Sequence, residues 1–375
     1  MKNPIEELST PSLLMDVERV RRNSARMSEF ALENGVRLRP HIKTHKSVEV
    51  ARIATTGHSG GVTASTIGEI EAFAAHGFDD FTYAVPIVPG KIPRIVRLLA
   101  SGVKVNLLTD DPDMPAELEK AARSSGVELN VFVKVDCGYH RCGVEPGSDA
   151  AVRTVRGISE GIGLNLAGIL THAGHSYHGG SREEIAEIAS AERDVMCDFA
   201  DDLRSSGIPV PVVSIGSTPT MTHIDHLEGV DEIRPGNYVF FDAFQATLGS
   251  CGFSDCAITV LASVVHRSFT NQKVIVDAGA IALSKDRGPV ELESGCGYGR
   301  VLDLAGDDTG LRVGSLSQEH GEIKVEDQRL LDRLKVGTKL RILANHSCLT
   351  AAQFGHYEVM ENTQIVDRWE IHRGW

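Results

Sequence analysis

Long hydrophobic runs and positive charge are both scarce in this sequence of 375 residues. A membrane span requires roughly 18 to 20 uninterrupted apolar residues, and no stretch approaches that length. The start MKNPIEELSTP also lacks the basic segment and apolar run of a targeting signal. Lys and Arg number 38 against 51 Asp and Glu, a formal charge of −13, which argues against a nucleic-acid binder because phosphate contacts favour a basic surface. We expect a cytoplasmic protein without nucleic-acid or membrane partners.

Cysteine is too sparse and too scattered for a disulfide framework. The chain has 7 cysteines, an odd number, and we expect most of them to be reduced and buried. The composition, 42% hydrophobic and 24% charged, is that of an ordinary globular protein with a core large enough for two domains.

Short runs rich in Val, Ile and Leu alternate with helical segments from about residue 16 to residue 245. Eight of these runs are predicted strands: VRLRPHIK, GVTAST, DFTYAV, VKVNLL, LNVFVKVD, LAGILTHAG, VPVVSIGST and EIRPGNYV. Eight βα units predict an α/β fold of the TIM type, a (β/α)8 barrel. The alternative, an open doubly wound sheet, lacks its usual signature because no GxGxxG follows the first strand.

The sequence predicts two domains. The barrel is predicted over residues 13–245, with a helix over 16–35 before its first strand. The predicted buried positions of this helix are Val17, Val20, Ala25, Met27 and Leu32. Beyond residue 250 the hydrophobic period shifts towards two, which predicts a C-terminal, mainly antiparallel β domain over residues 246–375, with residues 1–12 packed on it.

Lys43 is the candidate nucleophile, at the end of the first predicted strand, where the active site of such a barrel lies. Arg39, His41 and Lys43 share one parity, so they point to one face of an extended strand. Like charges from Arg39, His45 and their neighbours would depress the pKa of Lys43 and leave its amine able to form a Schiff base. The competing interpretation is a set of solvated charges on a loop.

A phosphate site is the second requirement of this chemistry. Gly216-Ser217-Thr218 and Gly236-Asn237-Tyr238 offer backbone N–H groups and hydroxyls after the seventh and at the eighth strand, where barrels commonly bind phosphate. A lysine beside a phosphate site suggests pyridoxal phosphate, whose ring serves as an electron sink. An aldolase that uses lysine without a cofactor is the competing chemistry.

A candidate metal pair follows in the C-terminal domain. His346 and Cys348 are two positions apart and would face one way on an extended segment, and imidazole with thiolate suits zinc. Two ligands do not complete a tetrahedron, so water, a substrate hydroxyl or a third residue would fill an open catalytic site. The alternative is a packed cysteine beside an unrelated histidine.

As an ordered set, these motifs resemble the D-threonine aldolase and D-serine dehydratase family, the metal-dependent branch of the alanine-racemase-like, fold-type III pyridoxal phosphate enzymes. The resemblance covers nearly the whole chain. It rests on RPHIKTHK at 39–46, DCGYHRCGV at 136–144, THAGHSY at 171–177, GSTPT at 216–220, EIRPGNYVFFD at 232–242 and NHSCLT at 345–350.

The resemblance implies that Lys43 forms the imine with the cofactor, and that His346 and Cys348 hold the metal near the substrate's β-hydroxyl. The further cofactor contacts that it implies come from Arg141 at the phenolic oxygen, His172 on the ring, Ser217, Thr218, Gly236 and Asn237 at the phosphate, and Gly216, Arg234, Tyr177 and Tyr238 nearby. His175 and Tyr177 are additional catalytic candidates. The expected metal is Zn²⁺, with Mn²⁺ as the alternative, and the expected assembly is a homodimer.

The residue types of the metal pair guide the choice of reaction. In this family, His with Cys favours the dehydratases and His with Asp the aldolases. We therefore expect a dehydratase that converts a D-3-hydroxy amino acid such as D-serine into a 2-oxo acid and ammonia. The alternative is a D-threonine aldolase that yields glycine and an aldehyde, with His175, His178 or metal-bound hydroxide as base. A racemase, which needs no metal at the β-position, and a non-catalytic cofactor carrier, which resembles a lone barrel, are more remote. The choice among D-serine, D-threonine and D-threo-3-hydroxyaspartate stays open.

Overall fold

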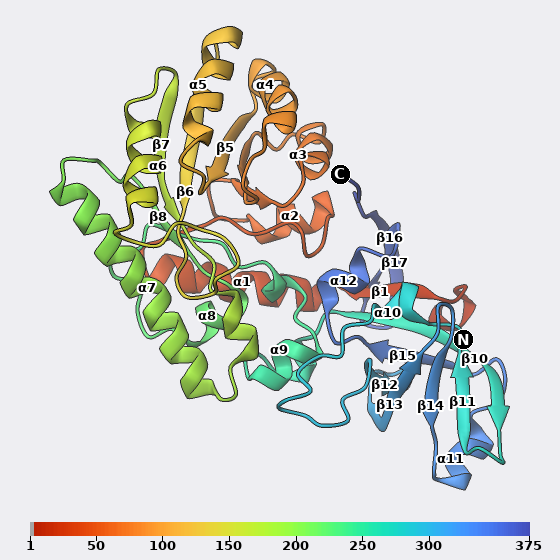
Figure 1. Ribbon diagram of the computed structural model, residues 1–375. Helices are drawn as coiled ribbons and strands as arrows, with labels where there is room; N and C mark the ends of the chain where they lie inside the picture. Colours follow the sequence, from red (N-terminus) through yellow and green to blue (C-terminus); the bar gives the residue numbers. More distant parts are fainter. Residues whose placement is uncertain (1–3) are drawn as a thin grey trace. The chain divides into compact units, whose positions relative to one another are not determined.

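The computed structural model describes residues 4–375, and Figure 1 shows their helices and strands. The chain divides into two compact units. One, the sheet unit, comprises the N-terminal residues up to Ala25, Thr44–Ile53 and Asn237–His372; the other, the barrel unit, comprises Arg26–Lys43, Ala54–Gly236 and Arg373–Trp375. Within residues 4–375, no helix combines the length and the apolar character needed to cross a membrane.

Eight parallel strands form the sheet of the barrel unit, in the order β2-β9-β8-β7-β6-β5-β4-β3. Their bounds are β2 (Arg37–Leu38), β3 (Val62–Ala64), β4 (Asp80–Tyr83), β5 (Lys104–Thr109), β6 (Leu129–Lys134), β7 (Leu164–Leu170), β8 (Val213–Ile215) and β9 (Glu232–Ile233). The ring closes because His41, just after β2, pairs with Thr63 of β3, and the Ile42 N–H donates to the Thr63 carbonyl at 2.8 Å. All eight predicted strands are present, and the predicted barrel is confirmed.

Helices follow the strands and cover the outside of the barrel (Figure 1). They are α3 (Ile67–Ala74), α4 (Ile92–Ala100), α5 (Met114–Ser125), α6 (Asp149–Ser159), α7 (Arg182–Ser205) and α8 (Thr218–His223). Local sequence sets their ends. Thr66 caps α3 through a capping box with Glu69, Ser148 caps α6, and Gly126 ends α5 with a left-handed φ of +70°.

Nine strands form the sheet of the other unit, in the order β11-β14-β13-β12-β15-β10-β1-β16-β17. Their bounds are β1 (Ser12–Asp16), β10 (Ile258–Ser268), β11 (Lys273–Val276), β12 (Arg300–Leu302), β13 (Asp308–Leu316), β14 (Gly321–Lys324), β15 (Lys339–Leu343), β16 (His356–Glu361) and β17 (Gln364–Glu370). β11 also pairs with β10, and the β1–β16 pair is parallel while the others are antiparallel. The predicted mainly antiparallel C-terminal fold is confirmed.

Short helices complete the sheet unit: η1 (Pro4–Glu7), η4 (Asn237–Val239), α9 (Ala243–Leu248), η5 (Phe253–Asp255), α10 (Ala280–Leu283), α11 (Gln328–Arg333) and α12 (Ser347–Ala351). The remaining helices α1 (Val17–Glu33) and α2 (Val48–Ala54) have residues in both units, and the 3-10 turns η2 (Pro89–Lys91) and η3 (Gly174–His178) belong to the barrel unit.

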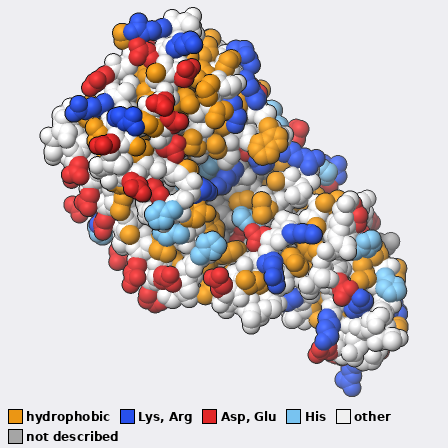
Figure 2. Space-filling model, viewed as in Figure 1, with side chains coloured by type: hydrophobic (Ala, Val, Ile, Leu, Met, Phe, Trp, Pro, Cys, Tyr) orange, Lys and Arg blue, Asp and Glu red, His pale blue; other side chains and the backbone are white. Residues whose placement is uncertain are grey.

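The units divide after Gly236, nine positions before the predicted boundary at residue 245, and β1 belongs to the sheet unit. Hydrogen bonds explain both differences. The Ala243 N–H donates to the Ala344 carbonyl at 3.3 Å, and β1 pairs with both β10 and β16. Side chains of both signs of charge are interspersed over the surface visible in Figure 2.

The predicted helix over 16–35 is observed as α1, but its buried face was only partly predicted. Val17, Val20 and Met27 are buried, whereas Ala25 and Leu32 are exposed. The buried face instead includes Asn23, whose amide donates to the Asp255 carbonyl at 2.9 Å. Because a polar residue lies on the buried face of α1, that face does not coincide with the positions that apolar residues alone would predict.

Candidate functional site

Basic side chains gather around His172 at the carboxyl ends of the barrel strands. Burial lowers the pKa of His172 well below its ordinary value, and the positive charges of Lys43, Lys134, Arg141 and Arg234 lower it further. The structure thus brings predicted residues from the ends of β2, β6, β7 and β9 into one electrostatic environment. In that environment His172 is neutral at pH 7.

Arg234 is fixed by neutral partners. Its side chain is buried, its Nε–H donates to the Ser214 hydroxyl at 2.7 Å, and its NH2 group donates to the Thr171 carbonyl. The Ser214 hydroxyl in turn donates to Glu232 at 2.8 Å. Burial lowers the pKa of Arg234 to about 10, against the negative charge of Glu232, so the guanidinium stays charged at pH 7 with a single orientation.

Arg39 and His45 do not supply the like charges that the sequence predicted for Lys43. Arg39 is buried in ion pairs with Glu232 at 2.8 Å and Asp80 at 2.7 Å. Burial opposes its charge, but these two carboxylates outweigh burial and raise the pKa of Arg39, so its charge is neutralised locally. His45 belongs to the sheet unit, and burial lowers its pKa to about 3, which leaves it uncharged. The positive charges that act on His172 are those of Lys43, Lys134, Arg141 and Arg234.

Tyr139, which the sequence analysis missed, contacts three predicted site residues. Its ring stacks on His175 at a centroid distance of 6.0 Å, meets His172 edge-on at 6.5 Å, and lies 4.9 Å from the Arg141 guanidinium. Gly174 permits this arrangement, because a Cβ there would lie 2.3 Å from the Tyr139 ring. The sequence signal that could have identified Tyr139 as a site residue is its place in the GYHR motif, two positions before Arg141.

His175 and Tyr177 lie in η3, directly after β7. The Nδ1 atom of His175 is buried and has no hydrogen-bond partner in the structure. Burial lowers the pKa of His175, although the charge of Glu192 opposes this shift, so His175 is neutral at pH 7 and has the protonation state of a base.

The predicted phosphate turn follows β8 and is held by its own hydrogen bonds. Gly216 has a φ of +107°, and its N–H donates to Glu192 at 3.3 Å. The Ser217 N–H donates to the Thr220 hydroxyl at 2.9 Å, and the Ser217 hydroxyl caps α8 and contacts Ser176 at 3.1 Å. The backbone donors of Gly216 and Ser217 therefore have acceptors within the protein, and the phosphate contacts of residues 216–218 and Gly236 stay predictions.

Lys134 and Glu192 are two further buried charges that sequence reasoning missed. Lys134 ends β6, and burial together with the charge of Arg234 lowers its pKa to about 8. Glu192 projects from α7 and accepts the N–H of Ala173 at 2.8 Å as well as that of Gly216. A signal existed for both, since each is a charged residue within an otherwise apolar strand or helix face.

The candidate metal pair lies in the sheet unit, at the start of α12. Nδ1 of His346 lies 2.8 Å from Oδ2 of Asp286, and the Cys348 thiol donates to the Thr44 hydroxyl at 3.3 Å. Burial opposes charging of His346, but hydrogen bonds to Asp286 and Cys348 raise its pKa well above the ordinary value. The His346 and Cys348 side chains are thus neighbours, but not on the extended segment that the sequence analysis assumed, because His346 is the N-cap residue of α12 and Cys348 lies in its first turn.

No group of three or more His, Cys, Asp or Glu suited to a metal occurs within residues 4–375. If His346 and Cys348 bind a metal, the rest of the coordination shell would have to come from water or substrate. The Asn237 amide donates to Asp242 at 2.7 Å, Ser347 at 3.1 Å and Cys348 at 3.7 Å, so this predicted phosphate residue supports the metal pair. Tyr238 is fully buried beside it in η4.

Two family models match the chain. Residues 15–243 match the alanine racemase N-terminal domain, and residues 257–360 match a serine dehydratase domain. The chain is 38% identical to the D-threo-3-hydroxyaspartate dehydratase of Delftia sp. over 100% of both chains, and a solved structure of that enzyme matches with a TM-score of 0.96. It is 36% identical to the D-serine dehydratase of Dictyostelium discoideum, over 99% of this chain and 98% of that protein.

More distant structures share the architecture. A D-threonine aldolase from Filomicrobium marinum is 27% identical over 98% of this chain and 96% of that chain, with a TM-score of 0.86. The solved structures of the Delftia enzyme include a Cys-to-Ala mutant in the metal-free form and a His-to-Ala mutant.

Proposed function

The chain belongs to the alanine-racemase-like family of pyridoxal phosphate lyases that includes D-serine dehydratases, hydroxyaspartate dehydratases and D-threonine aldolases, and from this premise we propose that it is a zinc-dependent dehydratase of a D-3-hydroxy amino acid. The products would be a 2-oxo acid and ammonia. The observation that carries the proposal is the His346–Cys348 pair. Two dehydratases at 38% and 36% identity support it.

Pyridoxal phosphate fits the barrel residues. An anionic phosphorylated aldehyde complements the positive charges around His172, and Lys43, whose side chain is exposed, could form an imine with it. The barrel residues that would hold the cofactor are Lys43 at the aldehyde, Arg141 and His172 at the ring, and Ser217, Thr218 and Gly236 at the phosphate. When bound, pyridoxal phosphate supplies an electron sink for the pair left by the departing α-proton.

The protein's own groups have distinct tasks. Lys43, once the substrate's amino group has replaced it at the aldehyde, would have a free amine that takes the α-proton of the substrate as general base. His172 is held neutral by burial and by its basic neighbours, so it adds no charge beside the ring. Arg234 keeps one orientation through its bonds to Ser214 and Thr171, and its charge lies in a buried setting where electrostatic effects are strong.

Zinc fits the donor pair of the sheet unit. Imidazole and thiolate are ligands that Zn²⁺ prefers, and a two-residue set leaves positions for water and for the substrate's β-hydroxyl. Zinc would lower the basicity of the departing hydroxide, as it lowers the pKa of bound water. Cys348 would bind as the thiolate, so its proton is lost on metal binding. Mn²⁺ is the alternative ion.

A metal-dependent D-threonine aldolase is the second candidate function. It is favoured by the neutral state of His175, which could take the proton of the β-hydroxyl while the Cα–Cβ bond breaks. The products would then be glycine and an aldehyde. The likeness to the aldolase of Filomicrobium marinum, at 27% identity, supports this alternative less than the dehydratases support the first.

Product analysis decides between the two. The purified protein, supplied with pyridoxal phosphate and zinc, is incubated with D-serine, D-threonine and D-threo-3-hydroxyaspartate, and with the L-enantiomers as controls. Ammonia with a 2-oxo acid supports the dehydratase, and the relative kcat/KM values identify the substrate. Glycine with acetaldehyde from D-threonine contradicts the proposal and supports the aldolase.

The homodimer and the cytoplasmic location also stay predictions. Sedimentation equilibrium tests the homodimer, and localisation of a tagged chain tests the cytoplasmic location.

A further inference from the structure

One ring nitrogen of His346 is already engaged. Its Nδ1 atom lies 2.8 Å from the Asp286 carboxylate, which is hydrogen-bond distance. The exposed fractions of the two side chains are 27% and 24%, so solvent reaches the contact only partly. Asp286 lies 60 positions before His346 in the sequence, and no sequence motif predicted their contact.

The position of Asp286 is fixed by its own loop. Its backbone N–H donates to the Ser284 hydroxyl at 3.2 Å, and its carboxylate accepts the Gly288 N–H at 2.8 Å. Its carbonyl accepts the Asn345 amide at 3.1 Å, which ties the loop to the residue before His346. Gly288 has a φ of +64°, and a Cβ there would lie 2.9 Å from Asn345, so this turn requires glycine.

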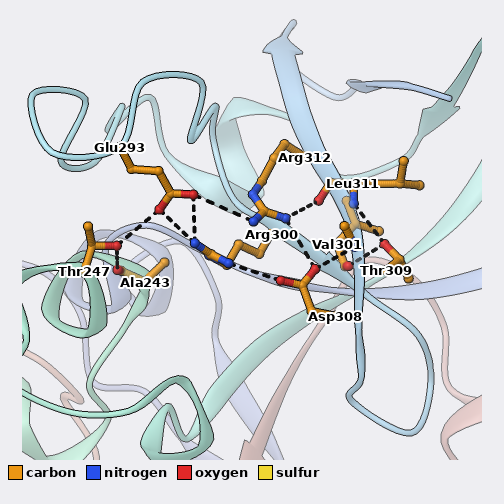
Figure 3. Close-up of polar contacts among 10 residues, drawn as sticks. Ala243, Thr247, Glu293, Arg300, Val301, Asp308, Thr309, Leu311 and Arg312 are labelled. Carbon is orange, nitrogen blue, oxygen red and sulfur yellow. Dashed lines mark hydrogen bonds and ion pairs between the residues drawn. The ribbon is translucent and has the colours of Figure 1, made fainter. Parts of the chain in front are cut away.

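Ion pairs anchor the far end of the same loop, as Figure 3 shows. Glu293 binds Arg300 of β12 through both carboxylate oxygens, at 2.7 and 2.8 Å, and accepts the Thr247 hydroxyl at 3.3 Å. Asp308 of β13 bonds Arg300 at 3.1 Å and Arg312 at 3.3 Å. Side-chain contacts therefore hold the loop that contains Asp286 to β12 and α9.

We propose that Asp286 is a positioning residue that keeps the proton of His346 on Nδ1, so that Nε2 presents its lone pair to the divalent cation. A metal-bound histidine that donates its other N–H to a carboxylate has a fixed ring orientation and a more basic ligand nitrogen. The inference rests on the proposed zinc-dependent function. A purely structural ion pair would contribute to stability and leave metal affinity unchanged.

Zinc affinity of the holoenzyme tests this assignment. Wild type, Asp286→Ala, Asp286→Asn and Asp307→Ala are stripped of metal with a chelator, kept loaded with pyridoxal phosphate, and titrated calorimetrically with Zn²⁺ against a competing chelator. Loss of such a carboxylate weakens metal binding about 10- to 100-fold, so we expect at least a tenfold higher Kd for Asp286→Ala. The amide oxygen of Asp286→Asn can still accept the Nδ1–H bond, so its Kd should lie between those of wild type and Asp286→Ala.

Asp307 is the matched control, an exposed carboxylate of the same unit, and its replacement should leave the zinc Kd unchanged. Cofactor affinity, read from the imine absorbance, should stay the same in all four proteins. Equal zinc affinity in wild type and Asp286→Ala overturns the inference and leaves zinc dependence intact. Failure of the wild type to bind one zinc per chain overturns both.

A second measurement needs no variant of Asp286. In zinc-loaded wild type labelled with ¹⁵N-histidine, the His346 resonances, assigned with His346→Gln, should show the ring proton on Nδ1. A proton on Nε2 would overturn the inference even if Asp286→Ala failed to fold.

Discussion

Replacement of Glu192 by alanine tests what holds the two loops of the barrel site together. One carboxylate oxygen accepts the N–H of Ala173, after β7, and the N–H of Gly216, after β8, at 2.8 and 3.3 Å. The Glu192 side chain is 0% exposed, and both amides are buried. Each buried donor left without an acceptor costs about 1–3 kcal/mol, so the loss of both acceptor contacts in Glu192→Ala should destabilise this region by about 2–6 kcal/mol.

Two variants separate the hydrogen bonds from other effects. Glu192→Gln keeps a carbonyl oxygen of the same shape and should lose only about 1 kcal/mol. Glu187 lies on the same helix but is exposed, so Glu187→Ala should change stability by less than about 0.5 kcal/mol.

Amide hydrogen exchange is the appropriate assay, because a chain of two units need not unfold in one step. Exchange at Ala173 and Gly216 should accelerate in Glu192→Ala by the factor that corresponds to the lost free energy, while exchange in the sheet unit stays unchanged. The cofactor Kd should rise in parallel. Unchanged exchange at both amides would refute the assignment, since the two N–H groups would then have some other acceptor.

Four further predictions concern the chemistry and the core. Lys43→Ala should lose both turnover and the absorbance of the imine between lysine and pyridoxal phosphate. Retention of that absorbance would contradict the cofactor assignment. Exhaustive chelation of zinc should abolish turnover and leave that absorbance intact, whereas full activity without metal would remove the role of the metal pair. The pKa of Lys134 is about 8 in the folded protein and about 10.5 when unfolded, so the unfolded state binds more protons between these values; stability should rise with pH across this window by up to about 3 kcal/mol, and Lys134→Met should flatten the rise in pH-dependent denaturation. Gly174→Ala should displace the Tyr139 ring and reduce kcat/KM about tenfold or more, whereas Gly90→Ala, where a Cβ meets nothing within 4 Å, should match wild type.

The barrel was predictable because its strands are short apolar runs separated by turn residues, and every one of the eight runs became a strand. The boundaries between the two units were harder to predict. β1 reads as three apolar residues, Leu13 to Met15, and only its pairing with β10 and β16 shows that it belongs to the sheet unit. Sequence periodicity reveals which face of a strand is buried, but it does not reveal which sheet the strand joins.

The site was predictable where chemistry is concentrated in a motif and unpredictable where it depends on distant partners. His346 and Cys348 share a motif, and they are neighbours in the structure. Arg39 is buried, but strand parity could not show that Glu232, 193 positions away, forms an ion pair with it, and β2 ends at Leu38, before Arg39. Asp286 was missed for the same reason, because its role depends on His346 and on no residue near it in sequence.

The distribution of charge links the fold to the proposed chemistry. A chain with a formal charge of −13 nevertheless gathers Lys43, Lys134, Arg141 and Arg234 around one neutral histidine. Arg39 is held in ion pairs with Glu232 and Asp80, whereas Arg234 has hydroxyl and carbonyl hydrogen-bond partners in place of a direct carboxylate. These positive charges lie at the carboxyl ends of the strands, where they would attract the anionic groups of a phosphorylated cofactor and of an amino acid. The local arrangement of charged side chains therefore says more about the ligand than the net charge of the chain does.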